Sequence, residues 1–376
     1  MRVAFVYDLI YPYSKGGVER RVFDLSRGLA NRGHDVHVFG TKQWAGPGKV
    51  VSEGVTLHGS RSLVPLHRRS GTRSVLHALL FAIWLPFQLW RTRPEAVDVQ
   101  SMSPLSCVVT LAVCRLSNTP VVVTWHEVWG PYWHSYLGLW GIFGRAVEVF
   151  IARLGTNHVA VSHLTARRVV SLGAQPMAVV PNGVDTKRVD SVPFGGYDRD
   201  VIYVGRMASH KKVSTLIEAM WILKGRGHAP SLSLVGDGPE AEALVAMASG
   251  LDNVEFLGQV ESEEGVWSLM KGSRVFVMPS EREGFGLAVL EALACGVPVV
   301  VAQHADNASA ELVEKGANGL LVDPTPIAMA DAIESILDDP TVVSNPGLRG
   351  GTWFPSMSLE NVIPQFESVY RRLVGS

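Results

Sequence analysis

The sequence predicts an α/β protein with two doubly wound domains, each built on a parallel sheet. The 376 residues, 47% hydrophobic and 18% charged, exceed the length at which a single core usually keeps growing. Short apolar or β-branched runs alternate with helical patterns along the whole chain, as in doubly wound sheets. A stretch rich in turn-forming residues, 191–197, is suited to link two domains. This composition excludes a disordered or fibrous chain.

The apolar runs predict six strands in each half of the chain. In the first half they are Val3–Tyr7, Asp35–Gly40, Val97–Gln100, Val121–Thr124, His158–Val161 and Ala178–Val180. In the second half they are Asp200–Val204, Ser231–Val235, Val254–Leu257, Val275–Met278, Pro298–Ala302 and Gly319–Val322. Ligands of open parallel sheets bind beyond the carboxyl ends of the strands, so functional residues are expected in the loops that follow these strands.

The three cysteines indicate a reducing compartment. They are too few for a disulfide framework, and Cys107 and Cys114 lie in an apolar run that predicts small core residues. The first residues end an apolar run at Asp8 and lack the long apolar segment of a secretory signal. We therefore expect a cytoplasmic protein, either free or peripheral at the cytoplasmic face of a membrane.

Charge is divided unevenly between the two halves. Residues 1–190 carry 21 basic and 11 acidic residues (+10), whereas residues 191–376 carry 13 and 24 (−11). Between Glu53 and Glu95 there is no acidic residue, but there are six arginines: Arg61, Arg68, Arg69, Arg73, Arg91 and Arg93. Two interpretations are open for this region.

The apolar segment 75–90 lies among these arginines. It is short for a bilayer span and is interrupted by Pro86. One interpretation places 61–93 on an anionic membrane surface, where each basic residue contributes on the order of 1 kcal/mol. The other makes 75–90 a helix packed on the first sheet, with an exposed basic end.

The strongest local motif surrounds Glu283 and Glu291. A buried strand is followed by a glycine-containing loop and then a helix, so the amides of Phe285, Gly286 and Leu287 can face an anion. Glu283 lies in the loop and Glu291 one to two turns into the helix, so both can contact a ligand. Alternatively, Glu283 caps the helix and Glu291 is a solvated surface residue.

A second loop contains Arg206, Lys211 and Lys212 after a predicted strand. The guanidinium offers a planar fork to phosphate oxygens and the ammonium groups offer mobile charge, so together they could neutralise a diphosphate. The alternative is a solvated basic turn, which suits Lys212 better than Arg206.

Two further loops belong to the first half. Gly16 and Gly17 follow the first strand and begin a helix, where glycine permits close approach of a ligand; the alternative is an ordinary turn. His126 follows a buried strand and could bond a hydroxyl or pass a proton, or be structural. The aromatic stretch 129–140 suits sugar stacking, a lipid interface or core packing.

The loop Gly236-Asp237-Gly238-Pro239 resembles a dinucleotide-binding turn only formally. Pro239 removes an amide that a phosphate would need, and the first strand lacks the corresponding fingerprint. A dehydrogenase is therefore not expected.

Taken together and in order, these motifs resemble the retaining glycosyltransferases of family 4, whose two-domain GT-B fold has Rossmann-like domains facing a central cleft. The resemblance covers nearly the whole chain. The residues that carry it are Gly16, Gly17, His126, Pro181 to Asp185, Gly205, Arg206, Lys211, Gly236 to Pro239, and the pair Glu283 and Glu291 separated by seven residues.

The resemblance implies a role for each of these residues. His126, Arg206, Lys211 and Glu283 would be catalytic, with the basic pair on the donor diphosphate and Glu283 on the sugar hydroxyls. Glu291 would hold the ribose. The remaining donor-binding positions would be Gly16, Gly17, Gln259, Val260, Gly284, Phe285, Gly286 and Leu287. Two departures stand out: Lys212 replaces a common glycine, and Gln100 and Ser101 stand where a histidine is frequent.

The resemblance also implies the reaction, which is transfer of a hexosyl unit from a nucleotide-diphosphate sugar to an acceptor with retention of anomeric configuration. It implies the organisation of the domains as well. Residues 1–190, completed by a C-terminal helix over 356–376, would form the acceptor side, and residues 191–355 would bind a UDP- or GDP-linked sugar. No metal and no nucleic acid is expected. The expected acceptor is lipid-linked or membrane-borne. The alternatives are a soluble acceptor, a sugar-nucleotide-binding subunit without catalysis, and a nucleotide-sugar epimerase.

Overall fold

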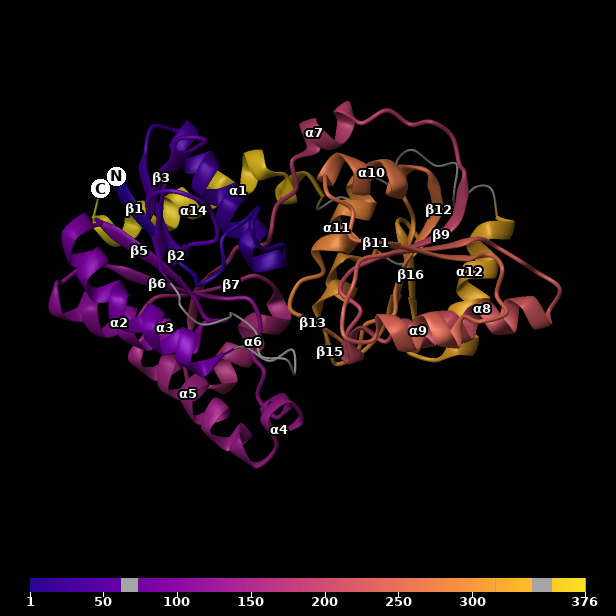
Figure 1. The fold of residues 1–376 in the computed structure, drawn as a ribbon, viewed down its shortest axis with the longest axis horizontal. Coiled ribbons are helices and arrows are strands. Elements are labelled where there is room, and N and C mark those ends of the chain that lie inside the picture. The colour runs from indigo at the N-terminus through magenta and orange to yellow at the C-terminus, as the bar shows by residue number, and fades with distance from the viewer. Residues whose placement is uncertain (62–73, 315, 340–353, 376) are drawn as a thin grey trace. The chain divides into compact units, whose positions relative to one another are not determined.

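The structure is a computed structural model that describes residues 1–61, 74–314, 316–339 and 354–375. The chain forms two compact units (Figure 1). Unit 1 comprises Met1–Gly183 and Leu359–Ser376, and unit 2 comprises Val184–Ser358. The predicted class, α/β with parallel sheets, is confirmed in both units.

Unit 1 contains an eight-stranded sheet in the order β3-β4-β2-β1-β5-β6-β7-β8. Its strands are β1 (Arg2–Val6), β2 (Asp35–Thr41), β3 (Lys49–Ser52), β4 (Val55–Ser60), β5 (Ala96–Gln100), β6 (Val121–Trp125), β7 (His158–Ala160) and β8 (Pro176–Val179). All neighbours are parallel except β3 and β4. The six strands predicted for this half are confirmed.

The hairpin β3–β4 was not predicted. Its turn consists of Glu53 and Gly54, both with positive φ (48° and 79°), which is the backbone that a two-residue hairpin turn requires. The Glu53-Gly54 pair between two short runs with β-branched residues is the feature of the sequence that indicates this hairpin.

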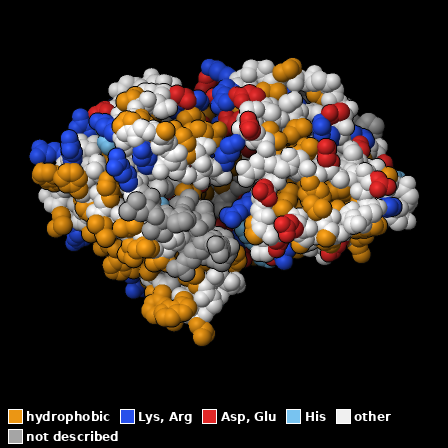
Figure 2. All heavy atoms as spheres, in the orientation of Figure 1, with side chains coloured by type: hydrophobic (Ala, Val, Ile, Leu, Met, Phe, Trp, Pro, Cys, Tyr) orange, Lys and Arg blue, Asp and Glu red, His pale blue; other side chains and the backbone are white. Residues whose placement is uncertain are grey.

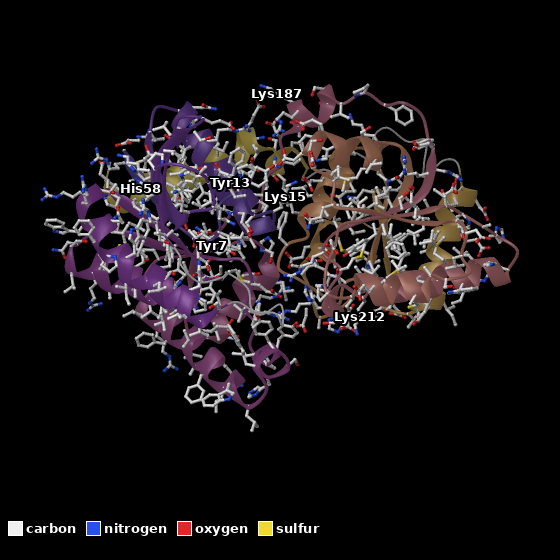
Figure 3. All side chains as sticks on the ribbon, in the orientation of Figure 1. Tyr7, Tyr13, Lys15, His58, Lys187 and Lys212 are labelled. Atoms are coloured by element: carbon white, nitrogen blue, oxygen red, sulfur yellow. The ribbon has the colours of Figure 1, made fainter. Side chains whose placement is uncertain are left out.

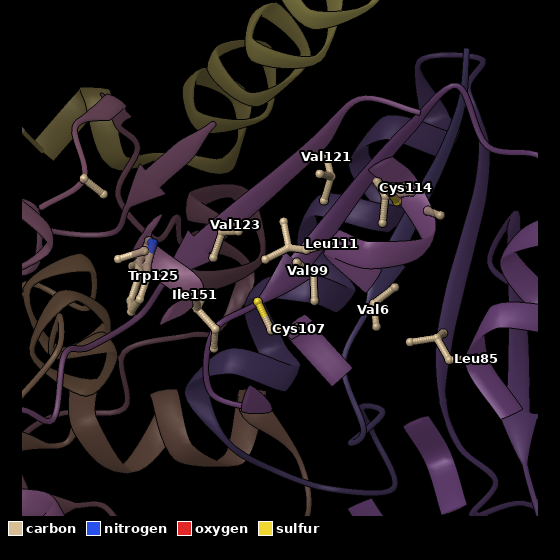
Figure 4. Close-up of a cluster of buried hydrophobic side chains, with 14 of the residues drawn as sticks. Val6, Leu85, Val99, Cys107, Leu111, Cys114, Val121, Val123, Trp125 and Ile151 are labelled. Atoms are coloured by element: carbon tan, nitrogen blue, oxygen red, sulfur yellow. The ribbon is translucent and has the colours of Figure 1, made fainter. Parts of the chain in front are cut away.

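Helices cover both faces of the unit 1 sheet, as Figure 1 shows. They are α1 (Gly17–Asn31), α2 (Val75–Thr92), α3 (Pro104–Leu116), α4 (Tyr132–Leu137), η1 (Gly138–Trp140), α5 (Gly141–Leu154), α6 (His163–Ser171) and α14 (Leu359–Val374). One core joins the sheet to α1 and α14, through residues such as Leu25 and Phe366. The other joins it to α2, α3 and α5 (Figure 4). Cys107 and Cys114 are free and buried there, as predicted.

Unit 2 contains a six-stranded parallel sheet in the order β11-β10-β9-β12-β14-β16. Its strands are β9 (Arg199–Val204), β10 (Leu232–Val235), β11 (Val254–Gly258), β12 (Ser273–Met278), β14 (Val299–Ala302) and β16 (Gly319–Val322), with a small pair of β13 (Arg282–Glu283) and β15 (Asp306–Asn307). The order of the strands reverses between β9 and β12. A doubly wound sheet binds its ligand at such a reversal.

The helical elements of unit 2 connect these strands. They are α7 (Thr186–Ser191), η2 (Ser209–Lys211), α8 (Val213–Gly225), α9 (Ala241–Met247), α10 (Glu263–Lys271), α11 (Leu287–Ala294), η3 (Ala308–Leu312), α12 (Pro326–Asp338) and η5 (Phe354–Met357). The six strands predicted for this half are confirmed. The two-residue strands β13 and β15 were not predicted because they are too short to show a period.

The units divide at Gly183 and Val184, ahead of the predicted boundary at 190/191. The helix α7 lies between these points and is held to unit 2. The buried Lys271 ammonium of α10 donates to the carbonyl oxygens of Val189 (2.7 Å) and Val192, and Arg188 pairs with Glu263 at 2.9 Å. The chain returns to unit 1 at Leu359, where α14 begins.

The helix α2 packs on the sheet of unit 1 with one side and leaves another side exposed. Phe81, Leu85 and Leu89 are buried in the core, whereas Ile83, Phe87 and Trp90 are exposed. By length and composition it is the one helix among the described residues that could span a membrane, but a third of it is buried inside the unit. A helix that supplies core residues to the sheet cannot at the same time cross a bilayer. Arg68, Arg69 and Arg73, which belong to the segment 61–93 expected at a membrane surface, lie outside the described residues.

Candidate functional site

The loops after β9 and β12 bring together two of the predicted catalytic residues of unit 2. The ammonium Nζ of Lys211 lies 2.6 Å from Oε1 of Glu283, and only 19% and 11% of these side chains are exposed. The amide of Glu281 also donates to the carbonyl oxygen of His210 at 3.0 Å, which joins the two loops. Because β9 and β12 flank the reversal of strand order, the ion pair stands where a doubly wound sheet binds its ligand.

His210 was not singled out from the sequence, although it directly precedes Lys211. Burial, together with the positive charges of Lys211, Arg282 and Arg206, lowers the pKa of its imidazole to about 4 against the opposing effect of Glu283. The ring is therefore neutral at pH 7. Arg282, which is contributed by β13, takes part in this effect and was not among the three basic residues of the predicted loop.

Lys211 and Lys212 have different partners. Lys212 adopts a left-handed backbone (φ 51°), the conformation for which glycine is the usual residue. It pairs with Glu281 at 3.3 Å, and both side chains are about 40% exposed. Arg206 is exposed, and its carbonyl oxygen accepts a hydrogen bond from the hydroxyl of Tyr203 at 3.1 Å. The structure thus assigns the enclosed ion pair to Lys211 and a surface pair to Lys212.

The helix α11 begins at Leu287 with Gly286 as its N-cap, in the loop that the motif predicted. Gly286 has φ 93°, and a Cβ there would lie 2.3 Å from Cβ of Ser309, so the position requires glycine for two reasons. The loop is supported by the buried Asn307, whose Nδ2 donates to the carbonyl oxygens of Ser280 (2.9 Å) and Ala302 (2.8 Å). This role of Asn307 is not visible in the sequence, because its partners are the loop residue Ser280 and the last residue of β14.

Glu291 is half-buried rather than a freely solvated surface residue. Its Oε1 accepts a hydrogen bond from Nε1 of Trp267 at 3.3 Å. Trp267 is fully buried in α10, and the guanidinium of Arg188 lies 5.3 Å from its ring centroid. One carboxylate oxygen of Glu291 is therefore oriented by a rigid indole.

The glycines of the loop after β10 are needed for packing. A Cβ on Gly236 would lie 2.0 Å from the carbonyl oxygen of Gly205, and one on Gly238 would lie 2.2 Å from that of Met207. The amide of Gly236 donates to the carbonyl oxygen of Gly258 at 2.7 Å. The loops after β9, β10 and β11 therefore pack side by side. The predicted nucleobase-side residues follow Gly258 at this edge: Gln259 is exposed and Val260 half-buried.

In unit 1, Gly16 caps the start of α1 and Gly17 is its first residue. A Cβ on Gly17 would meet no atom within 4 Å, whereas one on Gly16 would lie 2.5 Å from Oε2 of Glu19. The buried Glu19 thus folds back to the helix start, where a carboxylate is favoured by the helix dipole. Tyr13 and Lys15 extend from the same loop (Figure 3).

His126 is buried at the carboxyl end of β6 and contacts one of the residues that depart from the family pattern. Its Nε2 lies 2.7 Å from Oε1 of Gln100, at the end of the neighbouring strand β5. Burial, with the positive charge of Arg21, holds the pKa of the imidazole well below its usual value. The ring is therefore neutral at pH 7 and does not carry a positive charge.

The aromatic stretch divides into two parts. Trp129, Trp133 and Tyr136 pack on one another, with ring centroids 4.6 to 6.3 Å apart. Trp140, in contrast, is 70% exposed and stacks on the exposed Phe143. Core-like packing therefore accounts for the first part and leaves the second part at the surface.

Two family models match the chain in succession. Glycosyltransferase Family 4 matches residues 15–188, and Glycosyl transferases group 1 matches residues 186–348. Glycogen synthase from Mycobacterium tuberculosis is 27% identical over 367 residues, which cover 90% of this chain and 87% of the relative. Phosphatidyl-myo-inositol mannosyltransferase from Mycobacterium leprae is 28% identical over 342 residues (88% and 86%). Sucrose-phosphate synthase from Thermosynechococcus elongatus shares the fold, with a TM-score of 0.83, 24% identity and coverage of 100% and 99%.

Proposed function

Because the chain belongs to glycosyltransferase family 4 and has the GT-B fold, we propose that it moves a hexosyl unit from a nucleotide-diphosphate sugar to an acceptor, with retention of anomeric configuration. The acceptor in this proposal is lipid-linked or membrane-borne. The observation that supports a nucleotide-sugar donor is the Lys211–Glu283 ion pair, which joins the loops after β9 and β12.

The residues of unit 2 suit the charge that develops in this reaction. As the glycosidic bond to the diphosphate breaks, positive charge grows at the anomeric carbon and negative charge on the leaving group. Lys211 and Arg206 would stabilise the leaving diphosphate, together with the amides of Phe285, Gly286 and Leu287 at the start of α11. These groups supply positive charge without a metal ion.

The two carboxylates would position the donor. Glu283, already oriented by Lys211, would accept hydrogen bonds from hydroxyls of the transferred sugar. Glu291, oriented by Trp267, would accept them from the ribose. In this proposal the acceptor hydroxyl attacks on the face from which the diphosphate leaves, which retains the configuration of the anomeric carbon. A phosphate oxygen of the departing diphosphate takes the proton of that hydroxyl. The family resemblance also makes His126 of unit 1 a catalytic residue in this proposal.

Nucleotide binding is expected to stabilise the protein against heat. A ligand at 100 times its Kd adds roughly 2.7 kcal/mol to the free energy of unfolding. A thermal-shift panel of UDP, GDP, ADP and their glucose and mannose derivatives should show a rise in Tm for one nucleobase. The rise should be smaller in Lys211→Ala but preserved in Lys224→Ala, an exposed lysine of α8. No response to any nucleotide in the wild type would contradict the proposed donor class.

A surface of unit 1 supports a membrane-borne acceptor. We define the apolar face as the exposed side chains Ile83, Phe87 and Trp90 of α2, Leu139 and Trp140 of η1, and Ile142, Phe143 and Phe150 of α5. Helix α2 packs beside α3, and α3 beside α5, so these elements lie on one side of the sheet. Figure 2 shows hydrophobic side chains gathered over the part of unit 1 where these helices lie.

Exposed basic residues predominate beside the apolar face, although the exposed Glu95 follows Arg93. The exposed residues Arg91, Arg93, Arg115, Arg145 and Arg153 lie in or next to α2, α3 and α5. The only carboxylate within α2, α3, α4, η1 and α5 is that of Glu148, which is buried and accepts the amides of Trp129 and Gly130. An apolar surface edged mainly by arginine is complementary to an anionic lipid surface. We place the protein at the cytoplasmic face of such a membrane.

Removing the apolar face is expected to reduce membrane binding. Each aromatic side chain that leaves water contributes about 1.5–3 kcal/mol, so Phe87→Ser combined with Trp90→Ser, Trp140→Ser and Phe143→Ser should raise the Kd for vesicles containing phosphatidylglycerol at least tenfold (about 1.4 kcal/mol). Vesicle co-sedimentation measures this. Val245→Ser with Ile327→Ser, two exposed positions of unit 2, is the matched control.

Two outcomes would contradict the membrane part of the proposal. One is equal binding of the wild type to neutral and anionic vesicles, or to none. The other is an unchanged Kd in the fourfold variant. A soluble acceptor is the second candidate, because glycogen synthase is among the relatives that match most of this chain. Efficient transfer to a water-soluble glycan, without vesicles, would favour it.

A further inference from the structure

The buried neighbours of His126 form a continuous hydrogen-bonded chain. His126 Nε2 contacts Oε1 of Gln100 at 2.7 Å, and Nε2 of Gln100 donates to Oδ1 of Asp98 at 2.8 Å. The hydroxyl of Tyr370 donates to Oδ2 of the same carboxylate at 2.6 Å. Gln100, Asp98 and Tyr370 are all at most 1% exposed, so water does not replace these bonds.

Asp98 determines the orientation of the Gln100 amide. Its carboxylate accepts from Tyr370 and Gln100 and, at 2.7 Å, from Thr124. Burial outweighs the lowering effects of these three donors and of the guanidinium of Arg21, so the pKa of Asp98 is raised. Both carboxylate oxygens nevertheless accept hydrogen bonds from neighbouring donors, and as such an acceptor Asp98 requires Gln100 to direct its NH₂ group to Asp98 and its oxygen to His126.

The tautomer of His126 follows from that orientation. An amide oxygen only accepts, so the imidazole must donate from Nε2. In a neutral ring the other nitrogen then carries the lone pair. Among the described residues, no side chain or amide donates to Nδ1 of His126.

We propose that the chain Tyr370–Asp98–Gln100 holds His126 as the Nε2–H tautomer, so that Nδ1 is the atom that accepts a hydrogen bond from a hydroxyl of the bound sugar or acceptor. This deepens the proposed function and rests on it. Gln100, Asp98 and Tyr370 are then positioning residues, and His126 is the residue that touches the ligand. Burial together with Arg21 lowers the pKa of His126 and keeps the ring neutral for this role.

The chain also gives the C-terminal helix a part in the site. Tyr370 belongs to α14, whereas Asp98 and Gln100 belong to β5, and 272 positions separate Tyr370 from Asp98. The return of the chain to unit 1 therefore does more than bury apolar surface. It brings a hydroxyl to the carboxylate that orients Gln100.

The test compares Gln100→Leu with Thr124→Val. The first removes the acceptor for His126 at nearly unchanged volume. The second removes one donor to Asp98 but keeps Gln100 and His126 in contact. With ¹⁵N-labelled histidine and His126→Gln for assignment, the wild type and Thr124→Val should show a protonated Nε2 and an unprotonated Nδ1. Gln100→Leu should show a mixture of tautomers.

The kinetic readout should follow the tautomer. We expect kcat to fall on the order of 10²-fold in Gln100→Leu, with KM for the donor changed much less, because general acid–base and orienting contacts contribute about 10²–10⁴-fold. Thr124→Val should stay within a few fold of the wild type.

Three results would overturn the inference. They are a wild-type His126 protonated on Nδ1, an unchanged tautomer in Gln100→Leu, and a changed tautomer with unchanged kcat. The first is measured on the wild type alone, so it decides the question even if Gln100→Leu does not fold. Absence of any donor turnover by the wild type would instead refute the proposed function, while the tautomer measurement would still stand.

Discussion

Replacing Lys211 by alanine is expected to lower kcat for glycosyl transfer by about 10²–10³-fold, the loss that follows removal of one preorganised donor from a developing negative charge. The ammonium is largely enclosed and 2.6 Å from Glu283. Its removal therefore takes away a positive charge that would stabilise the leaving diphosphate. It also leaves the Glu283 carboxylate without this partner. Release of nucleoside diphosphate from the nucleotide sugar, with acceptor present, measures the effect.

Lys212→Ala is the matched control for this prediction. Lys212 is the next residue and carries the same charge, but it pairs with the half-exposed Glu281 at the surface. Its replacement should change kcat less than about threefold, because exposed ion pairs contribute only about 0–1 kcal/mol. If Lys212→Ala were the more damaging change, or if Lys211→Ala kept full activity, the assignment of the diphosphate contact to Lys211 would be wrong.

Phe366→Ala is expected to lower the free energy of unfolding of unit 1 by about 3–5 kcal/mol, the usual cost of removing a buried aromatic side chain. Phe366 is fully buried between α14 and the sheet. Its ring packs against Tyr370, with centroids 5.9 Å apart, and against the guanidinium of Arg21 at 4.6 Å. The cavity therefore also loosens the neighbours of Asp98. Urea unfolding followed by circular dichroism measures the loss.

The control for this change is Phe150→Ala on α5, in the same unit. Phe150 is 50% exposed, so its truncation leaves no closed cavity and should cost less than about 1 kcal/mol. A Phe366→Ala variant as stable as the wild type would show that α14 is not required for the core of unit 1. Binding of nucleotide in unit 2 should persist in Phe366→Ala wherever unit 2 remains folded.

Much of the fold was predictable because its signals are local. Twelve runs predicted strands, and each of them lies in one of the two parallel sheets. The position of a loop after a strand was enough to select Lys211, Glu283 and His126, since parallel strands present their carboxyl ends at one edge. The hairpin β3–β4 and the short pair β13–β15 were missed. The first has strands of only four and six residues joined by an uncommon Glu-Gly turn, and the second is too short to have a period.

What the sequence determined by itself was therefore the order of the elements, the sites of the loops and the family, all of which depend on neighbouring residues. Only the tertiary structure decided which distant groups meet. It separated Lys211 from Lys212 by their partners, surrounded His210 with Arg206 and Arg282, and joined Tyr370 to Asp98. Hydrogen bonds and burial act across space, so contacts between residues far apart in the chain leave no periodic trace in the sequence.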